Sequence, residues 1–164
     1  MKTLFLMRHA KSSWKDNSLD DIERPLNARG EKDAPKMAEI LKKKNVEVEA
    51  VFTSPALRAA ETAKIIWRGL NLSEDKFVTK EEIYAAGVKE LLQVVKNFPA
   101  KFNSIIMFGH NPGLTNLQNV LTEKYIDNIP TAGVVKIVFD INQWKEIEAG
   151  TGKLEFFEYP KKYK

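Results

Sequence analysis

Short apolar runs alternate along the chain with longer stretches in which apolar residues recur at helical spacing. Runs rich in apolar and β-branched residues predict buried strands at residues 3–7, 48–53, 104–108 and 134–141. A last strand is expected at the edge of a sheet over residues 153–159, and a short apolar piece stands at residues 77–78 in an otherwise irregular region. This order of short apolar segments is typical of a sheet whose strands are joined by longer connections.

Amphipathic segments between these runs predict helices. They begin after Asn27, at Ser54, at Val88 and at Leu114, and they end near Leu41, Gly69, Asn97 and Leu121. Ser54 and Pro55 are expected to start the second helix, because serine caps free N–H groups and proline fits the first turn. Strands separated by helices predict one α/β domain over residues 1–164, a three-layer sandwich whose mostly parallel sheet carries helices on both faces.

Chemically useful side chains follow three of the predicted strands. Arg8 and His9 follow the first strand, residues 54–58 follow the second, and His110 follows the strand at 104–108. Ligands of such sheets bind beyond the carboxyl ends of the strands, so these residues are expected to form one site. The chain has only two histidines, and both fall at this edge.

The residue types at this edge predict a phosphate site. Arginine binds phosphate oxygens through a planar fork of donors, and both Arg8 and Arg58 are expected there. Fixed positive charges stabilise the negative charge that spreads over a phosphoryl group during transfer. A neutral imidazole is a competent nucleophile, because the unperturbed pKa of histidine lies near neutrality.

The amino-acid composition excludes several other kinds of functional site. The chain has no cysteine, which excludes a disulfide scaffold, a zinc site built on thiolates and a cysteine nucleophile. The net charge of +4, from 26 basic and 22 acidic residues, suits an anionic substrate. Lysines at 42–44, 161, 162 and 164 are interpreted as solvated surface rather than as a nucleic-acid site. Two histidines without a third ligand do not predict a metal site.

The apolar run near the N-terminus ends at Arg8. It is too short for the apolar region of a signal peptide and for a membrane span. We therefore expect a cytoplasmic protein without a membrane segment.

Three segments resemble the histidine phosphatase superfamily. Arg8-His9-Ala10 resembles its Arg-His-Gly signature, and residues 54–62 and 109–113 resemble its second and third conserved segments. Residues 8–14 and 24–30 are similar to the SixA-like phosphohistidine phosphatase branch. The resemblance implies a phosphoglycerate mutase-like fold and phosphoryl transfer without a metal or other cofactor.

The resemblance also implies a role for each site residue. His9 is expected to attack phosphorus and to carry the phosphoryl group, while its other ring nitrogen donates to a backbone carbonyl. Arg8, Arg58 and His110 are expected to hold the phosphoryl oxygens. Arg24 has two open interpretations: a further contact to phosphate or substrate, or a structural cation that orders the loop of residues 12–24.

The chain differs from the family mainly at the glutamate that serves as general acid in many members. The position of its glutamate falls near Ala85, and the nearby Glu81 and Glu82 are interpreted as surface carboxylates. Without an acid, an alkoxide leaves about 10²–10⁴-fold more slowly, whereas the imidazole of a phosphorylated histidine leaves more easily. The predicted function is therefore hydrolysis of phosphohistidine through a covalent phospho-His9 intermediate, in a monomer whose open, shallow site takes a phosphorylated protein.

Two alternatives remain for the predicted site at this point, beside nucleic-acid binding through the lysine runs, which a steep dependence on salt concentration would reveal. The first is a broader small-molecule phosphatase that uses Glu81 or Glu82 as its acid. The second is a module that binds a phosphorylated protein without turning it over.

Overall fold

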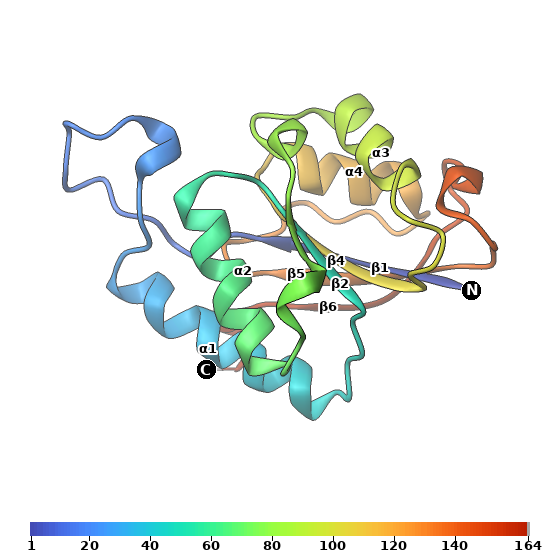
Figure 1. The fold of residues 1–164 in the computed structure, drawn as a ribbon, viewed down its shortest axis with the longest axis horizontal. Helices are drawn as coiled ribbons and strands as arrows, with labels where there is room; N and C mark the ends of the chain where they lie inside the picture. The colour runs from blue at the N-terminus through green and yellow to red at the C-terminus, as the bar shows by residue number, and fades with distance from the viewer. Residues whose placement is uncertain (164) are drawn as a thin grey trace.

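The computed structural model describes residues 1–163, which form a six-stranded sheet in the order β3-β2-β4-β1-β5-β6 (Figure 1). The strands are β1 (Lys2–Arg8), β2 (Ala50–Thr53), β3 (Phe77–Thr79), β4 (Ser104–Gly109), β5 (Val134–Phe139) and β6 (Lys153–Glu158). The four long helices are α1 (Ala28–Lys43), α2 (Leu57–Gly69), α3 (Val88–Lys96) and α4 (Gly113–Leu121). The predicted order of strands and helices is confirmed.

The sheet is parallel on one side and antiparallel on the other. Strands β1 to β4 pair with one another in parallel, whereas β5 runs antiparallel to β1 and β6 runs antiparallel to β5. The mostly parallel sheet is thus confirmed, and the last strand lies at its edge as predicted. Parallel pairing of β2, β4 and β1 brings their three carboxyl ends to the same edge of the sheet.

Helices cover both faces, so the predicted three-layer sandwich is confirmed. Helices α1 and α2 lie on one face, and α3 and α4 lie on the other (Figure 1). Each face has its own apolar core: Met37 and Ile66 belong to one, and Leu91 and Leu117 belong to the other. Burying each such side chain stabilises the fold by roughly 1.5–3 kcal/mol.

The predicted start of the second helix is wrong. The helix begins at Leu57, with Ala56 as its N-cap, and Ser54 and Pro55 precede it. The backbone N–H of Ser54 donates to the carbonyl of Phe108 at 3.1 Å, so the chain is still held to β4 at this residue. The Ser54 hydroxyl oxygen accepts from the N–H of Ala56 at 3.2 Å, which is a turn contact and not a helix cap.

One further strand and one long loop complete the frame of the site. Residues 77–79 form the edge strand β3, where the sequence pattern gave only a short apolar piece. The loop of residues 12–24 leaves the sheet at the carboxyl end of β1 and contains a short 3-10 helix, η1 (Asp21–Glu23) (Figure 1). Over residues 1–163, none of the helices has the length and apolarity needed to cross a bilayer.

Candidate active site

Two imidazole rings face each other where β1 and β4 end. The ring centroids of His9 and His110 are 5.2 Å apart. The backbone N–H of His9 donates to the backbone carbonyl of Gly109 at 3.2 Å, which holds the two strand ends together. His9 is 8% exposed, so it forms the floor of the site.

The backbone fixes the tautomer of His9. Its Nδ1 lies 2.8 Å from the carbonyl oxygen of Ala10, and because a carbonyl only accepts, Nδ1 must carry the proton and donate. The Nε2 atom of neutral His9 therefore keeps its lone pair. Burial is the main cause that lowers the pKa of His9 to about 3, and the positive charges of Arg58 and Arg8 also lower it. The hydrogen bond to Ala10 has the opposite effect. At neutral pH His9 has the form that a nucleophile needs.

His110 is held by Ser54, a residue that the sequence analysis assigned to the start of the second helix. Its Nε2 lies 2.8 Å from the hydroxyl oxygen of Ser54, and its Nδ1 is buried without a hydrogen-bond partner among the described residues. Burial lowers the pKa of His110 to about 4, and the nearby charge of Arg58 contributes. Ser54 is therefore a site residue. Its position at the end of the second strand, four residues before Arg58, indicated this in the sequence.

The two predicted phosphate-binding arginines are both present at this edge. Arg58 lies in the first turn of α2 and is 7% exposed. The Nη1 atom of Arg8 donates to the carbonyl of Ile129 at 3.1 Å, and its buried Nε has no partner within residues 1–163. Both guanidinium charges lower the pKa of both histidines, so all four residues act within one electrostatic environment. The structure brings together the four side chains that the sequence predicted.

Arg24 makes the contacts of a structural cation. Its Nε donates to the carbonyl of Ser13 at 3.1 Å, its Nη2 donates to the hydroxyl of Ser12, and its guanidinium stacks on the ring of Trp14. The remaining nitrogen, Nη1, pairs with Asp21 at 2.9 Å. These contacts favour the interpretation that Arg24 orders the loop of residues 12–24.

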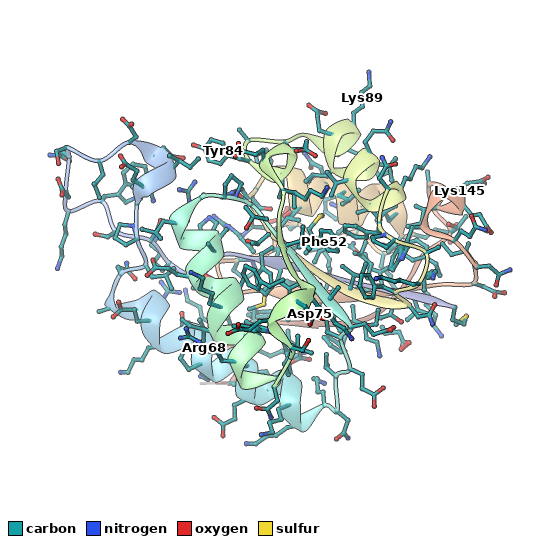
Figure 2. The ribbon with its side chains drawn as sticks, in the orientation of Figure 1. Phe52, Arg68, Asp75, Tyr84, Lys89 and Lys145 are labelled. Atoms are coloured by element: carbon teal, nitrogen blue, oxygen red, sulfur yellow. The ribbon has the colours of Figure 1, made fainter. Side chains whose placement is uncertain are left out.

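Asp21 and Tyr84 are site residues that the sequence analysis missed. The Oδ2 atom of Asp21 accepts from Arg58 Nη2 at 3.0 Å and from the Tyr84 hydroxyl at 2.6 Å. Tyr84 also packs edge-on against His110, with 5.6 Å between ring centroids, and lies between η1 and α3 in Figure 2. The bond from Tyr84, and then the bond and charge of Arg58, lower the pKa of Asp21 to about 2. Asp21 is therefore ionised at neutral pH and accepts hydrogen bonds rather than giving protons.

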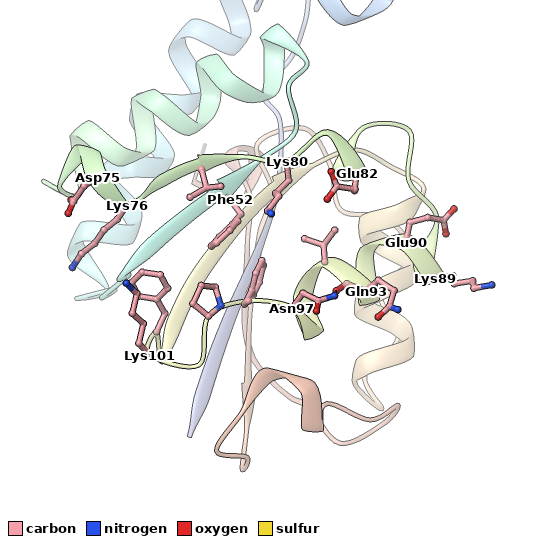
Figure 3. A pocket seen from close by; sticks show the side chains of 15 residues that line it. Phe52, Asp75, Lys76, Lys80, Glu82, Lys89, Glu90, Gln93, Asn97 and Lys101 are labelled. Atoms are coloured by element: carbon pink, nitrogen blue, oxygen red, sulfur yellow. The ribbon is translucent and has the colours of Figure 1, made fainter.

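The two glutamates considered as general acids lie at the surface. Glu81 and Glu82 are both exposed in the 3-10 helix η3 (Glu81–Ile83). Glu82 lines a groove of about 790 Å³ between β3 and α3, with Phe52 and Phe98 among the other lining residues (Figure 3). None of the predicted site residues lines this groove. Ala85, near which the resemblance puts the family glutamate, is exposed as well, and its methyl group has no proton to give.

The buried, positively surrounded imidazoles give a pH prediction. Burial and the arginine charges disfavour the imidazolium form, so the pKa of each histidine is lowered and the neutral form persists into acid. Because the chain has two histidines, an NMR titration of the free protein resolves both rings. We expect neither His9 nor His110 to protonate between pH 8 and about pH 5, where an exposed histidine does. A ring that titrates near pH 6.5, assigned with His110→Gln, contradicts this environment.

The model of the histidine phosphatase superfamily (branch 1) matches residues 4–86 of the chain. An uncharacterised chloroplastic protein of Arabidopsis thaliana is 30% identical over 159 residues, which cover 92% of this chain and 72% of that protein. The chain belongs to branch 1 of the histidine phosphatase superfamily. This membership supports phosphatase chemistry for the His9 site.

Solved structures show which fold this histidine phosphatase has. The structure of the protein histidine phosphatase SixA complexed with tungstate matches with a TM-score of 0.82 and 24% identity, covering 99% of both chains. A SixA structure from Agrobacterium tumefaciens matches with a TM-score of 0.83 and 21% identity, covering 97% of this chain and 98% of that one. The fold expected from the sequence is therefore confirmed.

Proposed function

We propose that this histidine phosphatase hydrolyses phosphohistidine on a protein through a covalent phospho-His9 intermediate. His9 Nε2 attacks phosphorus, and Arg8, Arg58 and His110 hold the phosphoryl oxygens. Water then releases phosphate from His9. Positive charge comes from these side chains, so the proposal includes no metal or other cofactor.

One observation carries the choice of substrate: the carboxylate at the site is not a proton donor. Asp21 contacts Arg58 and is ionised, while Glu81 and Glu82 are exposed. The resemblance puts the family glutamate near Ala85, which has no acidic group. A phosphomonoester needs a proton for its departing alkoxide, and general-acid help supplies about 10²–10⁴-fold. Phosphohistidine leaves as an imidazole, which is far less basic than an alkoxide and can take its proton from solvent at the other ring nitrogen, so this site suits it better.

The surroundings of His9 support a protein as the carrier of the phosphoryl group. Lys11 and Trp14 are exposed on the loop that leaves the site, and Trp14 is 70% exposed although Arg24 stacks on its ring. An exposed tryptophan is a common anchor in protein interfaces. The proposal thus includes a cytoplasmic monomer that acts on a phosphorylated protein surface and binds neither nucleic acid nor a membrane.

The test is hydrolysis of a phosphohistidine peptide and a phosphoserine peptide of matched sequence, with a chelator present. We expect kcat/KM for phosphohistidine to exceed that for phosphoserine by at least about 10²-fold, because only the ester needs an acid. The first-order release of phosphate from each peptide at low concentration measures both values in one assay.

Two other results of this assay would indicate the two alternative functions. Equal rates on the two peptides contradict the proposal and indicate a broader phosphatase with an acid such as Glu81 or Glu82. Binding of both peptides without phosphate release indicates a phosphoprotein-binding module.

A further inference from the structure

Asp21 is a carboxylate at the mouth of a site built for an anion. Its Oδ1 accepts from Arg24 Nη1 at 2.9 Å, and its Oδ2 accepts from Arg58 Nη2 and from the Tyr84 hydroxyl. A carboxylate has about four acceptor positions, so about one is free, on Oδ1. The Asp21 side chain is 47% exposed, which leaves this position accessible from solvent.

A negative charge here opposes phosphate binding, since it neutralises part of the charge of Arg58. Within residues 1–163, Asp21 is the carboxylate that forms an ion pair with Arg58 and with Arg24. Its η1 segment is held in place by a second bond, from Arg58 Nη1 to the Asp21 carbonyl at 2.7 Å. Because a carboxylate repels the phosphoryl group, we infer that this fixed carboxylate binds another part of the substrate.

The direction of attack by His9 places the leaving group of the substrate near Asp21. In-line displacement places the leaving group on the side of phosphorus opposite the attacking nitrogen. His9 forms the buried floor, so the leaving group points toward the exposed mouth, where Asp21 and Tyr84 stand.

We propose that Asp21 is a catalytic and specificity-determining residue that accepts a hydrogen bond from the N–H of the departing imidazole. The inference rests on the proposed function and deepens it. In the reactive form of the substrate, the ring nitrogen that is not bonded to phosphorus has taken a proton from solvent. An ionised carboxylate beside this N–H raises the pKa of the ring and so favours the protonated form. Asp21 thereby favours the form of the ring that departs as neutral imidazole without a proton from the enzyme.

The step balances without a proton from the enzyme. The bond from phosphorus to the substrate nitrogen breaks as the bond from phosphorus to His9 Nε2 forms. The electron pair of the broken bond stays on the substrate nitrogen, and the proton on the other nitrogen stays in place, so neutral imidazole departs. An ester has no such N–H, and its departing oxygen gains negative charge near Asp21, so the same carboxylate disfavours esters.

The experiment compares two leaving groups in one pair of variants. Wild type, Asp21→Asn and Asp16→Asn are assayed on a phosphohistidine peptide and on p-nitrophenyl phosphate, whose leaving group has no N–H. Asparagine keeps the size of Asp21 but removes its charge. Asp16 is the matched control, because it lies on the same loop and its carboxylate bonds to Ser18.

We expect Asp21→Asn to lower kcat/KM for the phosphohistidine peptide by about 10-fold to 100-fold, the range of one charge-assisted hydrogen bond. The aryl phosphate should show no loss and a gain of up to about 3-fold, since it gives Asp21 nothing to accept and its departing oxygen no longer lies near a negative charge. Asp16→Asn should match wild type on both substrates.

Three results overturn the inference, and they are distinguishable. Equal losses on the two substrates mean that Asp21 acts only by holding Arg58, and no loss on phosphohistidine means that it has no role. A wild-type enzyme that cleaves the aryl phosphate but not phosphohistidine overturns the proposed function together with the inference.

Discussion

Replacing His9 by alanine is expected to lower turnover of phosphohistidine by a factor on the order of 10⁴–10⁶, the range seen when a nucleophile is removed. The reason is geometric. His9 Nδ1 is held by the carbonyl of Ala10, so the lone pair on Nε2 is the one available for attack. In His110, the other histidine at the site, Nε2 is already engaged by Ser54. Release of phosphate under steady-state conditions measures the loss.

The control for this variant is the fold itself. His9 is buried, and its removal leaves the carbonyl of Ala10 without its donor, so thermal unfolding is followed for His9→Ala and for His9→Gln. Glutamine keeps a polar side chain of similar length. Both variants are expected to stay folded and to be inactive. A folded His9→Gln protein that keeps more than a few per cent of wild-type turnover contradicts the role of His9.

Replacing Arg58 by alanine is expected to lower kcat/KM by about 10²–10³-fold, the loss typical of one preorganised donor to the transition state. Arg58 is 7% exposed and is oriented by two bonds to Asp21, so its fork is fixed before substrate arrives. Arg58→Lys keeps the charge but not the planar pair of donors, and it should recover only part of the loss. Initial rates over a range of phosphohistidine concentrations measure kcat/KM.

Arg68 provides a matched control for this prediction. It lies in the last turn of the same helix α2, far from the strand ends (Figure 2). Arg68→Ala is expected to retain kcat/KM within about 2-fold, as for a surface change away from the site. A similar loss in both variants means that positive charge on α2 acts at long range, and it removes the assigned role of Arg58.

The sheet and its chemistry were predictable because both depend on local sequence. The run before Arg8 and the run before His110 are continuous and apolar, which is the pattern of parallel strands covered on both faces. Parallel strands end at the same edge, so the four catalytic candidates could be placed together before any coordinates. The direction of β5 and β6 was not predictable, since an apolar β-branched run is the same for parallel and antiparallel pairing.

The rim of the site could not be predicted, because it is formed by contacts between segments that lie far apart in the sequence. Asp21 is one of several acids in a polar loop without periodicity, and Tyr84 stands 63 residues away from it along the chain. Their contact depends on how the loop folds back across the strand ends, which involves the buried guanidinium of Arg24 and its stacking on Trp14. The start of α2 was misplaced because Ser54 bonds to β4 and to His110 instead of capping a helix.

The most direct test of the central claim is to locate the phosphoryl group during turnover. Wild-type enzyme is mixed with phosphohistidine substrate, quenched in alkali, where phosphohistidine survives, and mapped by mass spectrometry. The account predicts a phosphoryl group on His9 that forms and decays at the rate of turnover and is absent from His9→Gln. Phosphate release without any phosphorylated His9, or with the group on His110, contradicts it.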